Sequence, residues 1–351
     1  MNILITGIGG PTPRSIAKSI RDNKSGHRII GIDANPKALG FYMTGLVDKS
    51  LVGPRVSDSG YWSFIEALIK KEHIDLAFVQ PELEVIEWGN YYNDKGTYPC
   101  PVLIPPVELA LPLMNKSLMS DVLEGTHFIP KTVSITHKDT KLEQIEKEIG
   151  YPCWIRANVG SGGLGSLKID GPDSLKPWLL VHADIPEFTV SEFLIGRHLA
   201  NQMLYIDGEY VKGASLECVE YVMASIAPSK VTGNTSYGRF LNEETYLSFC
   251  DDVIRYMCDK LNVKAHGVFS FDTKDDHQGN PKVTEINIRH MAYTGIMAAV
   301  GFDLISDTIT LLTEGPDKIV RDTNFQYDKP YAFLRDVDIE PIILDDRELK
   351  G

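Results

Sequence analysis

A group of charged and amide side chains in the second half of the sequence has the types and spacing of a metal site. Asp272 ends a strand-like stretch (FSFD), and Glu285, Asn287 and Arg289 alternate along the next one (EINIR). Side chains at i and i+2 of a strand share a face, and an antiparallel pairing would bring Asp272 opposite them. Two carboxylates and an amide oxygen suit Mg²⁺ bound together with substrate phosphates, and Arg289 would stabilise negative charge that develops on the substrate. The alternative is a solvated strand face with an ion pair, which the apolar flanking strands disfavour.

A glycine-rich segment, residues 157–168 (ANVGSGGLGSLK), has the composition of a phosphate-binding loop. Backbone amides at glycines approach a ligand closely, and successive amides form a nest for anions. The segment lacks the GxxxxGK[ST] signature of a P-loop, so we expect a turn between two strands that folds over a nucleotide as a flap. Arg156, on the preceding strand, suits phosphate oxygens. A surface hairpin without a ligand and a solvated arginine remain the alternatives. The loop candidates are Gly160, Ser161, Gly162, Gly163 and Gly165.

The N-terminal segment GIGG (residues 7–10) is another glycine motif between an expected strand and an expected helix. Asp33 ends the next strand, where a dinucleotide-binding fold keeps the carboxylate that binds the ribose. The third glycine of that motif is missing, because Thr12 and Pro13 follow, and we favour a tight turn without a dinucleotide. An NAD(P)-dependent oxidoreductase stays open as an alternative. In either case the glycines can shape a pocket at the carboxyl ends of the strands.

The pattern of expected strands and helices that must position these groups changes near residue 107, from alternating strands and helices to strand hairpins. In the first part, buried-strand runs alternate with helical stripes, which predicts a parallel sheet in a Rossmann-like layer. Its expected strands are 2–6, 27–33, 75–80 and 101–104, and its expected helices are 12–21 and 61–71. The second part has a hairpin signal, Asp207-Gly208, which favours antiparallel sheet. There we expect helices at 109–123 and 249–261 and strands at 151–159, 167–170, 203–211, 265–272 and 281–287.

The composition narrows the class of protein. The 351 residues carry 35 Lys and Arg against 48 Asp and Glu, so we expect no broad basic face for nucleic acid. Five scattered cysteines without a CxxC pair are typical of reduced thiols. No run of residues resembles a signal peptide or a membrane span, which predicts a cytoplasmic protein without membrane contact.

Together these motifs resemble the ATP-grasp superfamily, and most of all the small proteins that are similar to the large subunit of carbamoyl phosphate synthase. The resemblance runs from residue 1 to about residue 315. Five motifs carry it, in the expected order: MNILITGIGG, Asn115-Lys116-Ser117, WIRANVGSGGLG, VSEFLIG (190–196), and Asp272 with EINIR.

The resemblance implies an α/β fold in which a Rossmann-like pre-ATP-grasp domain precedes an ATP-grasp fold. The first domain would span residues 1–107. The ATP-grasp domain would span 108–320 and consist of two α+β subdomains with the nucleotide between them. Residues of about 130–190 would form the flap subdomain, and 321–351 a C-terminal tail.

The resemblance also implies roles at the phosphates and the metal. Lys116 matches a cation that reaches the α-phosphate, and Arg156 matches a second cation, where lysine is usual. Residues 160–165 would cover the β- and γ-phosphates of ATP. Arg289 matches an arginine of the acyl-phosphate step, and it shares the catalytic role with Arg156. The matches to Mg²⁺ ligands, for two ions with Mn²⁺ as an alternative metal, are Asp272, Glu285 and Asn287.

For the nucleoside, the resemblance implies that the hinge at 191–194 holds the adenine through Glu192, Phe193 and Leu194. His198 stands where a ribose-binding glutamate is common. A neutral histidine still accepts a hydrogen bond from a hydroxyl, and the alternative is a solvated strand residue.

The function that the resemblance implies is an ADP-forming ligase. It would activate a carboxylate as an acyl phosphate and couple it to an amine, or to a thiol. The acid and the amine cannot be read from the sequence. Residues 229–239 and 290–295 are expected to line the acceptor pocket, with Arg239 and His290 as candidates for holding a substrate carboxylate. A homodimer is common in the family. The alternative is a non-catalytic ATP-binding subunit that needs a partner chain.

Overall fold

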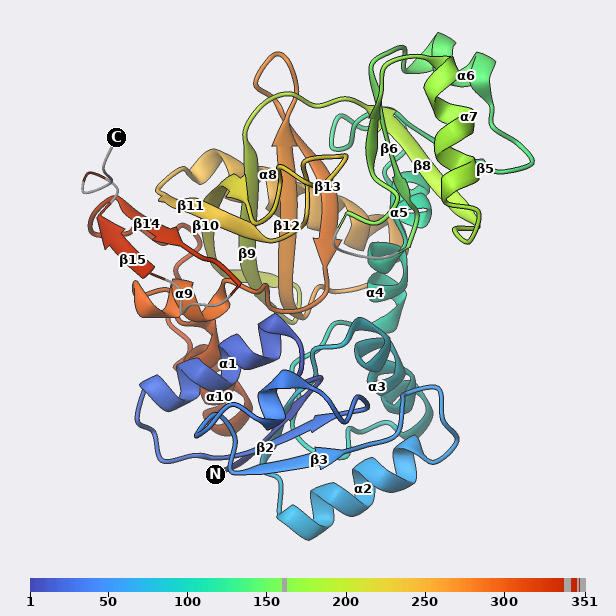
Figure 1. Cartoon of the computed structure of the whole chain (residues 1–351). Helices are drawn as coiled ribbons and strands as arrows, with labels where there is room; N and C mark the ends of the chain where they lie inside the picture. The colour runs from blue at the N-terminus through green and yellow to red at the C-terminus, as the bar shows by residue number, and fades with distance from the viewer. Residues whose placement is uncertain (160–162, 338–341, 346, 348–351) are drawn as a thin grey trace.

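Three β-sheets organise the chain in the computed structural model, which describes residues 1–159, 163–337, 342–345 and 347. A four-stranded parallel sheet begins the chain. A four-stranded antiparallel sheet, here the flap sheet, and a seven-stranded antiparallel sheet, here the large sheet, follow (Figure 1). Among the described helices none combines the length and the apolar character that crossing a membrane requires.

The parallel sheet is the core of a Rossmann-like layer. Its strands are ordered β3-β2-β1-β4. The aliphatic side chains of β1, β2 and β4 are mostly buried, as expected of apolar runs in a parallel sheet, whereas the edge strand β3 has no buried residue. The expected strand at 101–104 is only a single parallel bridge between Val102 and Ala77. The elements are β1 (Asn2–Thr6), α1 (Pro11–Asp22), β2 (Arg28–Asp33), η1 (Leu39–Phe41), β3 (Lys49–Val52), α2 (Tyr61–Glu72), β4 (Leu76–Phe78) and α3 (Glu82–Lys95).

The first glycine motif forms the turn between β1 and α1. Gly7 has φ +65°, and a Cβ there would lie 2.6 Å from Cγ of Pro81. The amides of Gly9 and Asn35 donate to the two carboxylate oxygens of Asp33, at 2.9 and 2.8 Å. Because backbone amides of neighbouring turns already use this carboxylate, the geometry favours the tight-turn interpretation.

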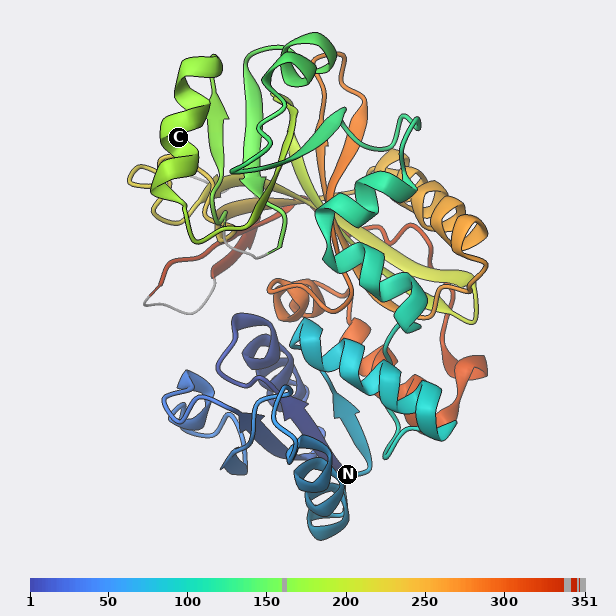
Figure 2. The ribbon, with the colours of Figure 1, turned by 90° about the vertical axis from the view of Figure 1, so that its right-hand side faces the viewer.

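The helix expected at 109–123 is divided in two, α4 (Val107–Met114) and α5 (Lys116–Val122). Asn115 between them is extended, with φ −118° and ψ 112°, and its side chain accepts from the amides of Ser117 and Leu118. An asparagine in this role caps a new helix, which the apolar periodicity of the segment conceals. Lys116 thereby becomes the first residue of α5. Both helices lead from the Rossmann-like layer toward the flap sheet (Figure 2).

The flap sheet has the strand order β5-β8-β6-β7, and the apolar residues of α6 and α7 pack against it. The glycine-rich segment lies between β6 and β7 in the sequence. The elements are β5 (Thr132–Thr136), α6 (Leu142–Glu148), β6 (Cys153–Ala157), β7 (Leu167–Ile169), α7 (Pro172–Val181) and β8 (Glu187–Glu192).

The large sheet has the order β13-β12-β9-β10-β11-β14-β15, so strands from the expected C-terminal tail are part of it. The predicted Asp207-Gly208 turn joins β9 to β10, with φ values of 51° and 94°. Its elements are β9 (His198–Ile206), β10 (Glu209–Tyr221), β11 (Thr235–Leu241), α8 (Glu244–Leu261), β12 (Gly267–Asp275), β13 (Pro281–Asn287), β14 (Tyr331–Leu334) and β15 (Ile342–Asp345).

After β13 the chain returns to the Rossmann-like layer through α9 (Thr294–Ala299), α10 (Leu304–Glu314) and η2 (Pro316–Lys318). The amide of Gly295 donates to the hydroxyl of Ser15 on α1 at 2.9 Å. Ile305 of α10 belongs to the same buried cluster as Ile16 and Ile20 of α1. Helices α9 and α10 therefore cover part of the surface of α1.

Candidate active site

A cavity of about 1050 Å³, here the first cavity, lies between the flap sheet and the large sheet. Most of the residues predicted to bind a nucleotide and a metal line it. They come from α5, β6, the hinge after β8, the start of β9 and the facing strands β12 and β13. The predicted residues in this lining are Lys116, Arg156, Gly163, Glu192, Phe193, Leu194, His198, Asp272 and Glu285.

Of the two predicted cations of the first cavity, Lys116 is buried and Arg156 is half-buried. Nζ of Lys116 lies 3.7 Å from Oε2 of Glu285, and burial lowers the pKa of Lys116 while the Glu285 charge opposes that shift. Burial also lowers the pKa of Arg156, against the charges of Glu285 and Asp272. Within the described part of the chain, the buried Nε of Arg156 has no hydrogen-bond acceptor. A buried donor without an acceptor, in the wall of a cavity, fits an anionic ligand such as a phosphate.

The predicted metal ligands lie on paired strands. Asp272 of β12 is directly opposite Glu285 of β13, and Ser270 is opposite Asn287, so the antiparallel pairing that the sequence predicts is present. Burial raises the pKa of Glu285, and the nearby Asp272 charge adds to that shift. Among the described residues, no group of three or more His, Cys, Asp or Glu side chains gathers as a metal site. The facing carboxylates of Asp272 and Glu285 are oxygen donors of the kind that Mg²⁺ takes.

His198 lies beside this carboxylate pair. Its Nε2 is 3.5 Å from Oδ1 of Asp272, and its Nδ1 contacts the hydroxyl of Tyr221. Burial raises the pKa of Tyr221, so its hydroxyl keeps its proton. The ring therefore lies in the cavity wall between a tyrosine and a predicted metal ligand.

The hinge residues form the opposite end of the first cavity. Glu192 accepts a hydrogen bond from the amide of Lys131 at 3.0 Å, which ties β8 to the start of β5. The ring centroid of Phe193 lies 6.1 Å from that of Trp154. The ammonium groups of Lys168 and Lys274 lie 5.4 and 5.7 Å from the Phe193 centroid. An aromatic ring flanked by an indole and two cations suits a planar base.

The described end of the glycine-rich segment approaches a loop of the large sheet. Gly163 has φ +76°, and a Cβ there would lie 2.7 Å from the carbonyl oxygen of Val231. Gly165 has φ +61°, and its carbonyl oxygen accepts from Nε1 of Trp178 at 2.9 Å. Glycine is therefore required at both positions. Gly160, Ser161 and Gly162 lie outside the described residues.

Arg289 links the end of β13 to the Rossmann-like layer. Its Nη2 lies 3.4 Å from Oε1 of Glu82 at the start of α3, and it donates to Oδ1 of Asn287 at 3.4 Å. Its Nη1 donates to the carbonyl oxygen of His290 at 3.0 Å. Asn287 ends β13 and Arg289 follows that strand, and neither is part of the lining of the first cavity.

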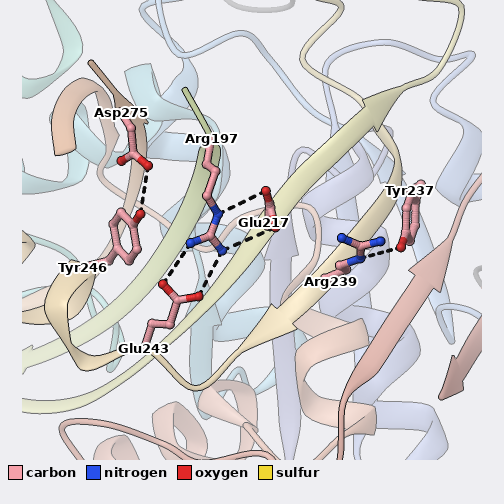
Figure 3. Close-up of polar contacts among 7 residues, drawn as sticks. All are labelled: Arg197, Glu217, Tyr237, Arg239, Glu243, Tyr246 and Asp275. Carbon is pink, nitrogen blue, oxygen red and sulfur yellow. Dashed lines mark hydrogen bonds and ion pairs between the residues drawn. The ribbon is translucent and has the colours of Figure 1, made fainter. Parts of the chain in front are cut away.

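The structure does not bring Arg239 and His290 to this cavity. Arg239 is exposed on β11 and donates to the hydroxyl of Tyr237 (Figure 3). The ring of His290 is buried, with Nδ1 within 3.0 Å of the Thr294 hydroxyl and 3.3 Å of Nε2 of Gln202. Burial lowers the pKa of His290 to about 4, so the ring is neutral at pH 7 and belongs to the interior.

Sequence reasoning missed a charged network behind the hinge (Figure 3). The guanidinium of Arg197 pairs with Glu217 at 3.2 Å and with Glu243 at 2.9 Å. The amide of Gly196 donates to the carbonyl of Asp275, and the amide of Asp275 donates to the carbonyl of Arg197, both at 3.0 Å. These contacts fix the end of the hinge to β10, β12 and the start of α8. No spacing in the sequence connects these residues, because they come from distant elements.

Residues 115–314, more than half of the chain, match the family model described as "Carbamoyl-phosphate synthase L chain, ATP binding domain". The comparison with curated proteins finds no match. Among solved structures, the N5-carboxyaminoimidazole synthetase of Staphylococcus aureus complexed with ADP has a TM-score of 0.71 and 13% identity. That match covers 95% of this chain and 81% of the other.

Two further solved structures have the same fold. The biotin carboxylase domain dimer of the Hydrogenobacter thermophilus 2-oxoglutarate carboxylase, in complex with MgADP and bicarbonate, has a TM-score of 0.68 and 12% identity, over 95% of this chain and 74% of its own. The L-amino acid ligase of Bacillus licheniformis has a TM-score of 0.65 and 13% identity, over 95% and 79%. Together with the family model, these likenesses confirm the predicted fold, a Rossmann-like layer followed by an ATP-grasp fold.

Proposed function

Because the chain belongs to the family of the carbamoyl-phosphate synthase L chain, ATP-binding domain, we propose that it is an ATP-dependent ligase that joins a carboxylic acid to an amine. The observation that carries this proposal is the first cavity, where the cations Lys116 and Arg156 face the carboxylates Asp272 and Glu285. Among the described residues the buried Nε of Arg156 has no acceptor, and such a donor suits a phosphate of ATP. One solved structure of the same fold is an L-amino acid ligase, which also supports a ligase.

In the proposed reaction, an oxygen of the substrate carboxylate attacks the γ-phosphorus of ATP. The bond from that phosphorus to the bridging oxygen breaks, and ADP leaves. The amine nitrogen then attacks the acyl carbon, the carbon–oxygen bond to phosphate breaks, and the phosphate leaves with the bonding electrons. The nitrogen loses one proton. The products are an amide, ADP and phosphate.

In these steps the side chains of the protein would position the phosphates of ATP and neutralise their negative charge. Lys116 and Arg156 would hold phosphate oxygens of ATP, and Arg289 would stabilise the charge that develops on the acyl phosphate. Asp272, Glu285 and Asn287 would hold Mg²⁺, which when bound neutralises charge on the transferred phosphoryl group. The approach of Gly163 to Val231 narrows one side of the cavity, and closing it would exclude water from the acyl phosphate.

The test is phosphate release that depends on Mg-ATP, measured with pooled carboxylic acids and pooled amines, ammonia included. Mass spectrometry of the products identifies both substrates. We expect release only when an acid and an amine are both present. Tight ATP binding without release from any pool would instead favour an ATP-binding subunit that needs a partner chain.

A further inference from the structure

Asn158 is a buried residue that connects the strand of Arg156 to the helix of Lys116. It directly follows β6, two positions after Arg156, and it is 3% exposed. Asn158 is not part of the lining of the first cavity, so it does not face the predicted nucleotide. A buried amide side chain needs partners for both its oxygen and its nitrogen, and those partners indicate what it holds in place.

The oxygen atoms of Asn158 bind the first turn of α5. Oδ1 accepts from the amide of Ser117, at 2.7 Å, and shares that donor with the side chain of Asn115. The carbonyl oxygen of Asn158 accepts from the amide of Lys116 at 3.4 Å. The hydroxyls of Ser117 and of Ser134 on β5 lie 2.6 Å apart. The start of α5 is therefore bound to the flap sheet, and the side chain of Lys116 leaves the backbone at that point.

The amide nitrogen of the Asn158 side chain binds Glu187 at the start of β8. Nδ2 donates to Oε2 of Glu187 at 2.5 Å, and the backbone amide of Asn158 donates to the carbonyl oxygen of Glu187 at 3.1 Å. A carboxylate only accepts hydrogen bonds and a backbone amide only donates them. One orientation of the Asn158 side chain therefore satisfies both Glu187 and Ser117, and Glu187 keeps Oδ1 directed at α5.

The two cations that Asn158 connects carry like charges in one cavity. Lys116 and Arg156 both line the first cavity. Burial lowers the pKa of Lys116, and the nearby charge of Arg156 adds to that shift. Because like charges repel, their separation is set by the elements that carry them. Asn158 joins those elements, the end of β6 and the start of α5.

We propose that Asn158 is a positioning residue of the nucleotide site. It holds α5 against the end of β6, so that Lys116 and Arg156 keep the spacing at which both bind the phosphates of one nucleotide. Glu187 supports this role by orienting the amide of Asn158. The inference rests on the proposed function, which puts ATP in the first cavity. It implies that Asn158 acts on the affinity for phosphate groups, through Lys116, and leaves the contacts of the base unchanged.

Calorimetric titration tests the inference by separating the phosphates from the nucleoside. One series uses a non-hydrolysable ATP analogue with Mg²⁺, and the other uses adenosine. Asn158→Ala should weaken binding of the analogue at least about fivefold, within the range of one net hydrogen bond. Adenosine should bind within about twofold of the wild type, because it has no phosphate for the cations to hold. A general loosening of the fold would weaken both ligands.

A double-mutant cycle tests whether the effect passes through Lys116. Lys116→Met should weaken the analogue at least about tenfold, because a charge-assisted contact is lost. In that background Asn158→Ala should change the affinity less than about twofold, since no ammonium group is left to position. Asn90→Ala, at an exposed position of α3 outside the cavity lining, is the matched control and should bind like the wild type.

Glu187 provides a second pair of variants. Its side chain is half-buried, so these variants test the inference even if Asn158→Ala fails to fold. Glu187→Gln keeps an acceptor oxygen for Nδ2 of Asn158 and should bind the analogue within about twofold of the wild type. Glu187→Ala removes the acceptor and should weaken the analogue at least about threefold, again without a change for adenosine.

The outcomes separate this inference from the proposed function. An unchanged affinity of Asn158→Ala for the analogue, an equal loss for adenosine, or a full effect in the Lys116→Met background would overturn the inference. The ligase proposal would survive each of these results if phosphate release requires an acid and an amine. If the variants behave as expected and no pool releases phosphate, the ligase proposal alone fails. A wild type that does not bind the analogue would overturn both.

Discussion

Gly196→Ala should weaken nucleotide binding through a purely steric effect at the hinge. A Cβ on Gly196 would lie 2.5 Å from Cβ of Asp275 and 2.9 Å from its carbonyl oxygen. Ordinary contact begins at 3.4 Å, so the two segments must separate by about 0.9 Å. The two backbone hydrogen bonds between them, at 3.0 Å, would then lengthen to about 3.9 Å, which is beyond hydrogen-bond range.

The loss of two backbone hydrogen bonds costs about 1–3 kcal/mol. Phe193 and Leu194 lie three and two residues before Gly196 in the wall of the first cavity, so they would move with it. We expect a thermal unfolding midpoint that is lower by several degrees and an affinity for a non-hydrolysable ATP analogue that is weaker by about tenfold, equivalent to about 1.4 kcal/mol.

Calorimetry of unfolding and titration with the analogue measure both effects. Gly171→Ala is the matched control, because Gly171 is extended and a Cβ there has nothing within 4 Å. If Gly196→Ala binds the analogue as tightly as Gly171→Ala does, the hinge does not carry the base and the reasoning is wrong.

Three further outcomes are expected. Arg289→Ala should abolish coupled phosphate release, because Arg289 would stabilise negative charge that develops only during the reaction. The affinity for nucleotide should stay within about threefold of the wild type. Normal coupled release would refute the assignment. Glu285→Gln should abolish turnover at matched Mg²⁺, since one carboxylate ligand is lost, and unchanged rates would count against the metal site. Burial lowers the pKa of His290 from 6.5 to about 4, so the unfolded chain takes up the proton first and stability falls as the pH drops below 6.5. At pH 5 this loss is about 2 kcal/mol relative to pH 8, and urea unfolding of wild type and His290→Gln at both values should show it only in the wild type.

Local spacing predicted the parts of the site that lie on paired strands. Asp272 faces Glu285 because both strands are apolar enough to form a hairpin, and their alternation sets which side chains share a face. The break at Asn115 was missed, because the apolar periodicity continues across it while a side-chain cap starts the second helix. The assignment of the catalytic and binding roles stays a prediction.

Contacts between distant elements could not be read from the sequence. Arg197 meets Glu217 and Glu243 only because β9 and β10 pair and α8 begins beside them. A second cavity, behind Gly7 and Asp33, exists because α4 and β13 close over the sheet edge. His290 likewise contacts Gln202 of β9, which is distant in the sequence. The residues next to His290 in the sequence therefore do not indicate that its ring belongs to the interior.

The packing of α10 on α1 bears on how the chain folds as it is made. Ser15 and Gly295 are 280 positions apart, and Ile305 of α10 adds to the cluster in which Ile16 and Ile20 of α1 pack against the parallel sheet. At about 5–20 residues per second, roughly 15–60 s pass between the synthesis of the two segments. During that interval Ile16 and Ile20 lack the cover that Ile305 provides. The Rossmann-like layer, although it precedes the other two sheets in the chain, completes its core only when α10 has been translated.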